Sequence, residues 1–148
     1  MCIRDRSNEL NFVPLICYEA IFSNFLKPSV KNADFILQIT NDAWFGRSIG
    51  PQQHLAQLRI RAIEYGLPVI RVANTGISAI IDANGIVLKN IPVNASGYLD
   101  AFIPSRKQST IYGEYGNLMF LSLIWMSLLF AFLYKQIISR VRLVIETN

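Results

Sequence analysis

The segment that organises the chain reads Val13-Pro14-Leu15-Ile16-Cys17-Tyr18-Glu19-Ala20-Ile21-Phe22. A short apolar run ends at a cysteine, and a carboxylate follows two residues later. Short apolar runs of this kind predict buried strands, and ligands and reactive groups gather at the carboxyl end of such strands in α/β domains. Cys17 is therefore either a nucleophile held on a rigid scaffold or a buried structural cysteine, since a free thiol packs like a small apolar group.

Apolar runs and turn signals alternate along the rest of the chain. Asn84-Gly85 predicts a tight hairpin turn, Pro51 is typical of a helix start, and Gly66 is typical of a helix end. Strands that alternate with helices and then form hairpins favour an α/β layered domain with a mixed sheet. The predicted strands cover residues 13–16, 35–40, 69–73, 78–82, 86–88 and 97–103. The first predicted helical stretch covers residues 20–26, is interrupted by Pro28 and ends near residues 32–34, and the second covers residues 51–65.

A long uncharged segment lies near the C-terminus. The chain has 148 residues, of which 52% are hydrophobic, and residues 115–134 include no charged side chain. Twenty helical residues rise about 30 Å, the thickness of the hydrocarbon core of a bilayer. We predict a single membrane-spanning helix over residues 115–134. The alternative is a helix buried in a protein core, which usually carries a polar stripe.

The charges around this segment predict its orientation. Lys135, Arg140 and Arg142 follow it closely, in a chain whose net charge is +4. The positive-inside rule then places residues 135–148 in the cytoplasm as a basic tail, and the preceding domain on the other side of the membrane. The basic residues form no face interleaved with aromatic residues, so we expect no nucleic-acid partner.

The first seven residues differ in character from the rest of the chain. Residues 1–7 are too few and too charged for a signal peptide, and they match neither helix nor strand periodicity. We interpret them as a non-native leader, which leaves Cys2 without a role, and we predict the domain over residues 8–108. Two cysteines make no disulfide framework in a chain of this length. An unpaired Cys17 in an external domain favours a functional thiol.

Several segments, taken in order, resemble the nitrilase (carbon–nitrogen hydrolase) superfamily and, within it, the C-terminal part of the apolipoprotein N-acyltransferase family. The matching segments include Ile16-Cys17-Tyr18-Glu19, Asn41-Asp42-Ala43-Trp44-Phe45-Gly46, Ser48-Ile49-Gly50-Pro51, Gln53-His54-Leu55 and Asn74-Thr75-Gly76. The first segment is moderately specific, and the ordered set is strongly so. The resemblance covers residues 12–134. It implies a partial nitrilase-like α-β-β-α sandwich, of the α/β class, followed by one C-terminal transmembrane helix.

The resemblance also implies an acyl transfer through a cysteine thioester. The thiolate of Cys17 would take a fatty acyl group from a membrane phospholipid and deliver it to the N-terminal diacylglyceryl-cysteine of an apolipoprotein. A thiolate attacks an ester well, and a thioester acylates an amine; the backbone N–H of Tyr18 would help hold the oxyanion. The implied partners are the phospholipid, the lipoprotein and the membrane. The implied location is the bacterial inner membrane, with the catalytic domain on the periplasmic side.

The family's catalytic triad is Glu-Lys-Cys, with the glutamate and the lysine N-terminal to the cysteine. No residue before Cys17 fills either role, and Glu9 is too close in sequence to be the family's glutamate. We therefore expect a fragment that carries the nucleophile and is inactive on its own. Two alternatives remain: a membrane-tethered amidase of the same superfamily, in which water replaces the amine acceptor, and a non-catalytic binding domain.

The residues around the nucleophile have predicted roles. Glu19 is a candidate catalytic carboxylate that supports the site or, equally, a helix N-terminal carboxylate stabilised by the helix dipole. Tyr18, Trp44 and Phe45 are predicted to bind substrate as an apolar wall for an acyl chain, and the alternative for them is core packing.

Polar residues farther along the chain have supporting roles in this interpretation. Asn41 and Asp42 are predicted to fix their loop through Asx-type hydrogen bonds, and His54 is predicted to be solvated or to cap its helix. Arg59 and Arg71 would pair with internal carboxylates or meet phosphate head groups. The sequence contains no metal-ligand cluster, and we expect neither a metal nor a cofactor.

Overall fold

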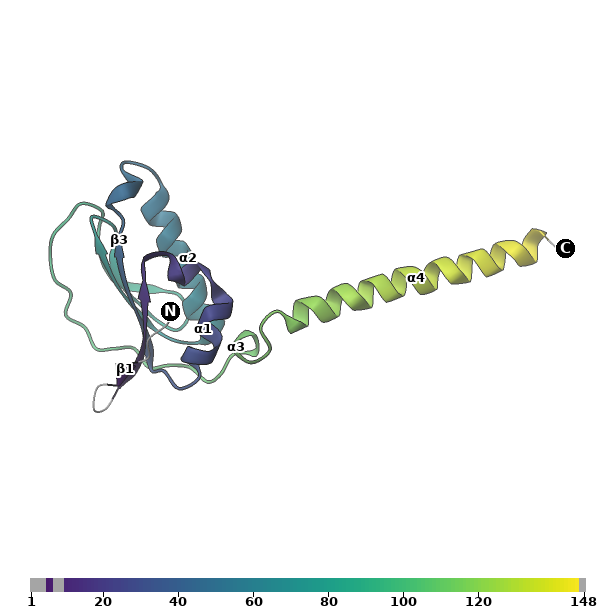
Figure 1. Cartoon of the computed structure of the whole chain (residues 1–148), viewed down its shortest axis with the longest axis horizontal. Helices are drawn as coiled ribbons and strands as arrows, with labels where there is room; N and C mark the ends of the chain where they lie inside the picture. Colours follow the sequence, from purple (N-terminus) through teal and green to yellow (C-terminus); the bar gives the residue numbers. More distant parts are fainter. Residues whose placement is uncertain (1–4, 7–9, 147–148) are drawn as a thin grey trace. The chain divides into compact units, whose positions relative to one another are not determined.

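The computed structural model describes residues 5–6 and 10–146. The chain divides into two compact units, Met1–Glu114 and Tyr115–Asn148, and each is described by itself. The first unit is an α/β domain, and the second consists mainly of one long helix (Figure 1).

A six-stranded mixed sheet forms the body of the first unit, which confirms the predicted fold class. The strands lie in sequence order across the sheet, from β1 to β6. Strands β2, β3 and β4 are parallel to one another, while β1, β5 and β6 pair antiparallel to their neighbours. The carboxyl ends of the three parallel strands therefore lie at one edge of the sheet. The strands are β1 (Asp5–Arg6), β2 (Asn11–Ile16), β3 (Phe35–Asn41), β4 (Val69–Asn74), β5 (Ser78–Ile81) and β6 (Val87–Ile91).

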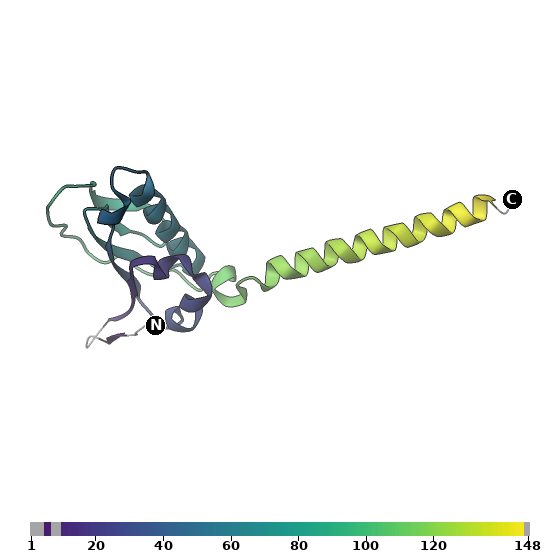
Figure 2. The same cartoon turned by 45° about the horizontal axis from the view of Figure 1, so that its top comes forward.

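Two helices, α1 (Ser23–Val30) and α2 (Gly50–Tyr65), cover one face of this sheet (Figures 1 and 2). A short 3₁₀ helix, η1 (Cys17–Ile21), precedes α1. Helix α2 has Pro51 in its first turn and ends at Gly66, whose φ is 63°; both signals were predicted. The core between helices and sheet contains Val13, Leu15, Ala20, Leu26, Val30, Ala33, Ile36, Leu58, Ala62, Tyr65, Leu67, Val69, Ala79 and Ile81.

The opposite face of the sheet carries a row of exposed apolar side chains. Ile16 pairs with Ile39, and Ile39 pairs with Val72, across β2, β3 and β4. Their side chains are 62%, 54% and 51% exposed, respectively. Successive residues of a strand point to opposite faces, and the neighbours Leu15 and Gln38 are accordingly buried on the helix side. An apolar sheet face normally packs against a second layer, as it would in the α-β-β-α sandwich.

Helix α1 differs from its prediction. Pro28 lies inside the helix and does not interrupt it. The helix continues because Leu26 and Val30, one turn apart, are both buried in the core. The contacts of these two side chains outweigh the single backbone hydrogen bond that proline removes near the helix end.

The hairpin predicted at Asn84-Gly85 is confirmed, since β5 and β6 pair on either side of it. The strand predicted over residues 97–103 is wrong, because that segment has no strand structure. Tyr98 and Phe102 in it are 86% and 97% exposed. Alternating apolar residues form a strand only where a neighbouring strand offers hydrogen-bond partners, and none of the described strands pairs with this segment.

The predicted leader lies largely outside the described residues. This holds for residues 1–4 and 7, and also for Glu9. The remaining two residues, Asp5–Arg6, form strand β1 and pair antiparallel with β2.

The second unit holds the uncharged segment of the sequence. The short helix α3 (Ile111–Tyr115) crosses the boundary between the units, and α4 (Leu118–Glu146) follows it. The stretch Leu118–Ile138 has 21 residues and a mean hydropathy of 1.9, and none of its most apolar window is buried inside the structure. By length and composition this helix is able to cross a membrane.

Candidate active site

Cys17 lies where β2 passes into η1, and its side chain is half-buried. Its φ is +50°, in the left-handed region, where a residue other than glycine carries a strain of about 1–3 kcal/mol. A sharp turn of this kind between a strand and a helix projects a nucleophile beyond the edge of a sheet. The predicted nucleophile therefore stands at the carboxyl edge of β2, on a backbone that the surrounding structure must hold in place.

Side chains hold the backbone on both sides of Cys17. The N–H of Ile16 donates a hydrogen bond to Glu19 Oε2 at 2.9 Å, and the Gln38 amide Nε2 donates to the Cys17 carbonyl oxygen at 2.9 Å. The bond from Ile16 lowers the pKa of the Glu19 carboxyl, because it favours the charged form. This is the helix N-terminal contact, one of the two roles predicted for Glu19. Its part in catalysis stays a prediction.

The three predicted substrate-binding residues meet beside the nucleophile. Tyr18 lies 5.3 Å from Trp44 and 6.2 Å from Phe45, measured between ring centroids, and the rings of Trp44 and Phe45 stack at 4.2 Å. Trp44 is 62% exposed, so it is not a core residue. The loop closes tightly at Gly50, where a Cβ atom would overlap the Phe45 ring. The structure thus forms an aromatic cluster, Tyr18, Trp44 and Phe45, at the end of the sheet that carries Cys17.

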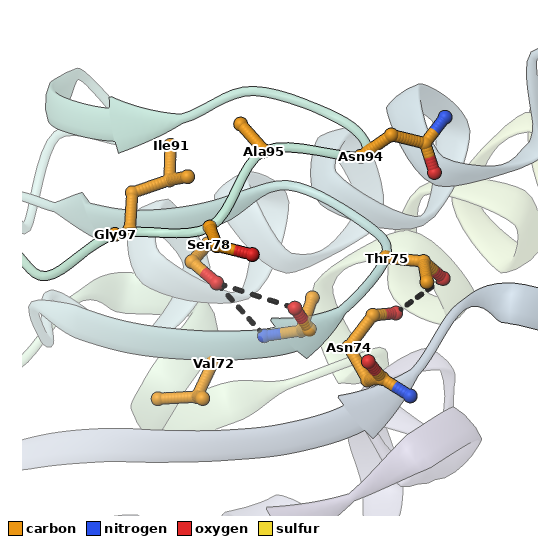
Figure 3. Close-up of a pocket in the computed structure, with 10 residues that line it drawn as sticks. Val72, Asn74, Thr75, Ser78, Ile91, Asn94, Ala95 and Gly97 are labelled. Carbon is orange, nitrogen blue, oxygen red and sulfur yellow. Dashed lines mark hydrogen bonds between the residues drawn. The ribbon is translucent and has the colours of Figure 1, made fainter.

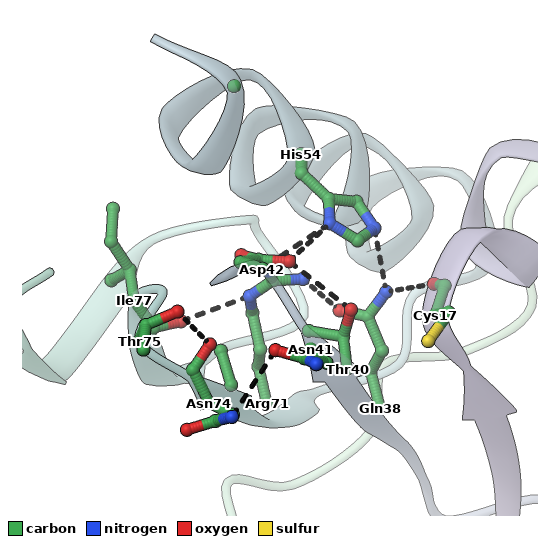
Figure 4. A network of polar contacts seen from close by, with 12 residues as sticks. Cys17, Gln38, Thr40, Asn41, Asp42, His54, Arg71, Asn74, Thr75 and Ile77 are labelled. Carbon is green, nitrogen blue, oxygen red and sulfur yellow. Dashed lines mark hydrogen bonds and ion pairs between the residues drawn. The ribbon is translucent and has the colours of Figure 1, made fainter. Parts of the chain in front are cut away.

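Behind this cluster lies a buried polar network of four side chains, which we call the Asp42 network (Figure 4). Its members, Gln38, Asp42, His54 and Arg71, are 0%, 2%, 2% and 1% exposed. Arg71 Nη2 donates to Asp42 Oδ2 at 2.5 Å, and Asp42 Oδ1 lies 3.0 Å from His54 Nδ1. Gln38 Nε2 lies 3.2 Å from His54 Nε2, and Arg71 Nη1 donates to Gln38 Oε1. His54 also stacks on Tyr18, at 5.0 Å between ring centroids.

The charges of this network compensate each other inside the protein. Burial lowers the pKa of Arg71, and the adjacent Asp42 carboxylate opposes that shift. Arg71 donates through Nε to the Ile77 carbonyl oxygen at 3.0 Å, while Thr40 donates to Asp42 Oδ1 at 3.2 Å. Buried charges are tolerated when they are paired and hydrogen-bonded in this way. The Asp42 carboxylate lies close against Gly76, where only a glycine leaves room for it, because a Cβ atom at this position would overlap the carboxylate.

Sequence reasoning misplaced His54. The predicted solvated or capping role is wrong, because the ring is buried in the Asp42 network. The signal that would have located it is its spacing from Leu58 and Ala62, four and eight residues later on the same face of α2. Asn41 does form the predicted Asx-type contact, with the Ala43 N–H donating to Asn41 Oδ1 at 3.1 Å.

A cavity of about 410 Å³ lies at the same edge of the sheet but does not include Cys17 (Figure 3). Asn74 and Thr75 at the end of β4 line it, together with Ser78 of β5 and the loop around Asn94. Thr75 and Asn94 have positive φ values of 57° and 60°, and the Asn94 N–H donates to the Thr75 carbonyl oxygen at 3.0 Å. Within the described residues, no group of three His, Cys, Asp or Glu side chains could hold a metal ion.

The arrangement of strands, nucleophile and loops is that of a known family. Residues 5–112 match the family model described as carbon-nitrogen hydrolase, which covers well over half of the chain. The chain belongs to the carbon–nitrogen hydrolase family. This carbon–nitrogen hydrolase chain contains the Cys17 turn, the aromatic cluster and the Asp42 network within the matched region.

Curated relatives of this carbon–nitrogen hydrolase chain are named apolipoprotein N-acyltransferase. The protein of that name from Rickettsia bellii is 46% identical over 132 residues, which cover 88% of this chain and 26% of the relative. The one from Sinorhizobium fredii is 52% identical over 95 residues, which cover 64% of this chain and 18% of the relative. The chain thus spans about a quarter or less of the length of these relatives.

Solved structures show the same fold at low sequence identity. NitN amidase from Neterenkonia sp. AN1 matches 62% of this chain and 38% of its own, with a TM-score of 0.50 and 18% identity. A carbon–nitrogen hydrolase superfamily protein from Xanthomonas campestris, with an arsenic adduct in its active site, gives a TM-score of 0.50 and 23% identity over 62% of this chain and 39% of its own. These matches confirm the nitrilase-like fold.

Proposed function

We propose that this chain carries the nucleophile of a membrane-anchored N-acyltransferase, which moves a fatty acyl group from a phospholipid to the N-terminal diacylglyceryl-cysteine of apolipoproteins. The observation that carries the proposal is the placement of Cys17 on a left-handed turn at the carboxyl edge of β2, directly beside the exposed aromatic cluster. Relatives named apolipoprotein N-acyltransferase, at 46% to 52% identity, support the choice of reaction.

The proposed reaction has two halves that share the Cys17 thioester. The Cys17 thiolate attacks the ester carbonyl carbon of the phospholipid, the carbon–oxygen bond breaks, and the lysophospholipid leaves as an alcohol after taking up a proton. The α-amine of the acceptor then attacks the thioester carbonyl and loses a proton, an amide forms, and the Cys17 thiolate is released. A thiolate serves both as nucleophile and as leaving group in this sequence.

The other catalytic groups of the resemblance lie N-terminal to the nucleophile. The described residues that precede Cys17 include neither glutamate nor lysine, so the proposal requires the base and the oxyanion-stabilising lysine from outside them. In this chain the N–H of Tyr18 belongs to the first turn of η1, whose N–H groups have no partner within the helix, and it would donate to the oxyanion. Glu19 would hold the turn through its bond to Ile16.

The aromatic cluster and the long helix suit substrates that stay in a bilayer. Trp44, 62% exposed, and its stacked neighbour Phe45 would form the predicted apolar wall for an acyl chain. The apolar stretch of α4 would anchor the domain at the membrane surface. We keep the predicted domain over residues 8–108, the span over 115–134, of which residues 118–134 belong to α4, and a cytoplasmic basic tail over 135–148. The domain would face the periplasm from the bacterial inner membrane.

An amidase is the second candidate function. A solved structure with the same fold shows a mutant of the amidase from Nesterenkonia sp. AN1 after Michael addition of acrylamide at its active site cysteine. If this domain were an amidase of that kind, the Cys17 thiolate would attack an amide carbonyl carbon, the carbon–nitrogen bond would break and the amine would leave after taking up a proton. Water would then hydrolyse the thioester to a carboxylic acid and release the Cys17 thiolate.

Intact-mass spectrometry tests the proposal. The longest polypeptide encoded in frame with this sequence is reconstituted in detergent with a phospholipid. We expect an acyl adduct that hydroxylamine removes and that Cys17→Ser abolishes, while Cys2→Ser, the matched control, keeps it. Addition of a diacylglyceryl peptide should discharge the adduct onto the peptide amine. Release of free fatty acid alone would show that water takes the place of the amine acceptor, as in the hydrolytic alternative, and no adduct on a folded chain would indicate a non-catalytic binding domain. The 148-residue chain alone should give none.

A further inference from the structure

The Cys17 carbonyl oxygen accepts a hydrogen bond from the side chain of Gln38, a residue that takes part in no step of the proposed reaction. Gln38 lies on β3, is fully buried, and donates from Nε2 to the Cys17 carbonyl oxygen at 2.9 Å (Figure 4). A buried amide at this position is unusual in a strand whose neighbours Ile36 and Leu37 are apolar. We propose that Gln38, oriented by the Asp42 network, is a positioning residue that aims the Tyr18 N–H at the oxyanion. This inference rests on the proposed acyl transfer.

The partners of Gln38 fix the orientation of its amide group. Arg71 has only N–H donors, so the Gln38 atom that accepts from Arg71 Nη1 is the oxygen Oε1. The NH₂ group then faces the other way, with one hydrogen for the Cys17 carbonyl oxygen and one for His54 Nε2, which lies 3.2 Å away. The amide of Gln38 has a single orientation in this environment.

The same partners assign the proton of His54. Because His54 Nε2 accepts from Gln38, the ring proton is on Nδ1, and Nδ1 donates to Asp42 Oδ1 at 3.0 Å. Arg71 Nη2 lies 3.3 Å from His54 Nδ1. Since both nitrogens carry hydrogens, that approach is not a hydrogen bond. Each donor nitrogen of the network thus has at least one acceptor, and the chain of bonds ends at the Cys17 carbonyl oxygen.

Holding this carbonyl also holds the N–H that follows it. The peptide unit between Cys17 and Tyr18 is planar and trans, so its C=O and N–H point in opposite directions. A bond from Gln38 to the oxygen therefore directs the Tyr18 N–H away from the protein interior. The Cys17 backbone, at a φ of +50°, would otherwise relax toward a less strained conformation, and the N–H would turn with it.

Gln38→Glu removes the amide donor to the Cys17 carbonyl oxygen, and with it the contact to His54 Nε2, while keeping an acceptor for Arg71. A glutamate keeps the size of the side chain and an oxygen for Arg71, but it has no N–H for the Cys17 carbonyl oxygen. Gln57→Glu is the matched control, because it makes the same change on the exposed side of α2. Both are made in the longest polypeptide encoded in frame with this sequence. Gln38→Met, neutral and of similar size, repeats the measurement without a new charge.

Two reactions of the Cys17 thiol separate positioning from structural damage. Acylation by a phospholipid builds up an oxyanion, whereas alkylation by iodoacetamide does not. Both rates are measured across pH, and their plateaus, where the thiol is ionised, are compared. We expect Gln38→Glu and Gln38→Met to slow acylation by about 10- to 100-fold, part of the effect of losing one oxyanion donor. The KM for phospholipid and the alkylation plateau should change by less than about threefold, and Gln57→Glu should match the wild type.

Each outcome decides between the hypotheses. If acylation and alkylation fall together, Gln38 has only a structural role, and the positioning proposal is wrong. If neither falls while the wild type forms the hydroxylamine-sensitive adduct, the proposal is also wrong and the proposed function stands. If the wild type forms no adduct on Cys17, the proposed function fails and the positioning role fails with it.

Discussion

The two faces of the sheet carry opposite kinds of residue at the edge that holds the nucleophile. On the helix side, Gln38 and Arg71 are buried and polar, at 0% and 1% exposure. Their immediate neighbours in sequence, Ile39 and Val72, point to the other face and are apolar, at 54% and 51% exposure. A sheet that merely had one face in water would show the reverse pattern, with polar residues outside.

This difference indicates that the buried face is stabilised by residues of the described chain, whereas the exposed apolar face requires an additional layer to cover it. On the helix side, the buried polar side chains of Gln38 and Arg71 form hydrogen bonds with other described residues. The partners of this face therefore all belong to the chain itself. On the other face the described chain leaves the row formed by Ile16, Ile39 and Val72 more than half exposed. Full burial of a valine or isoleucine side chain stabilises a protein by about 1.5–3 kcal/mol. A second sheet, as in the nitrilase-like sandwich, would gain that stabilisation.

The largest effect on stability should come from breaking the buried ion pair on the helix side. Arg71→Met leaves the Asp42 carboxylate buried without its cation, which costs about 3–5 kcal/mol. The free energy of unfolding of the chain in detergent, from urea titrations followed by circular dichroism, measures the effect. Arg47→Met, on an exposed loop residue, is the control and should change it by less than about 0.5 kcal/mol. A cost for Arg71→Met as small as that of the control would contradict the paired, buried network.

A pair of aliphatic truncations compares the two faces directly. Leu58→Ala on the helix side removes a fully buried side chain and should cost about 3 kcal/mol. Ile39→Ala on the other face should cost less than about 1 kcal/mol in this chain, because that side chain is half exposed.

The same pair in the longest in-frame polypeptide sharpens the comparison. If a second layer covers the outer face there, the cost of Ile39→Ala should rise toward that of Leu58→Ala. Equal, small costs of Ile39→Ala in both polypeptides would mean that this face stays in solvent.

A smaller loss of stability is expected from substitution of Gly76, the glycine that lies against the Asp42 side chain. In Gly76→Ala the new Cβ atom would lie 2.7 Å from Asp42 Cγ, and the forced shift should cost about 1–3 kcal/mol. Gly97→Ala is the control, since its Cβ atom would meet Ile91 at an ordinary 3.6 Å. The apparent melting temperatures of the two variants check this, and a Gly76→Ala variant as stable as the control would show that Asp42 moves aside freely.

Much of the fold followed from local sequence signals. The apolar runs predicted the strands from β2 to β5, Pro51 and Gly66 marked α2, and Asn84-Gly85 marked the hairpin. These features depend on residues close together in the chain. The strand expected over residues 97–103 failed, because pairing depends on a neighbour that the local pattern does not reveal.

Only part of the candidate site could be predicted from the sequence, because local patterns do not reveal contacts between residues far apart in the chain. Cys17 and the aromatic residues were found from their segments, and the structure brings Tyr18, Trp44 and Phe45 together. Pairing with an internal carboxylate, one of the two roles predicted for Arg71, is confirmed by its contact with Asp42. The rest of the Asp42 network was missed, since its contacts join residues 12 to 33 positions apart. A buried position was nevertheless readable for Arg71, which occupies the core-facing register of β4 two residues after Val69.

The smallest expected effect on stability comes from the hydrogen bond between the Ile16 N–H and Glu19, which also holds the turn at Cys17, and this effect depends on pH. The bond from the Ile16 N–H lowers the pKa of Glu19 below its ordinary value of 4.5. A group with a lowered pKa in the folded state stabilises the protein above its unfolded pKa, and this contribution is lost as the pH falls through the folded value. The melting temperature of the wild type should therefore decline more steeply below about pH 4.5 than that of Glu19→Gln, while the two run parallel between pH 6 and 8. Parallel curves over the whole range would mean that the Glu19 carboxylate does not hold the turn in solution, and the Gln38 bond would then have to hold Cys17 in place without it.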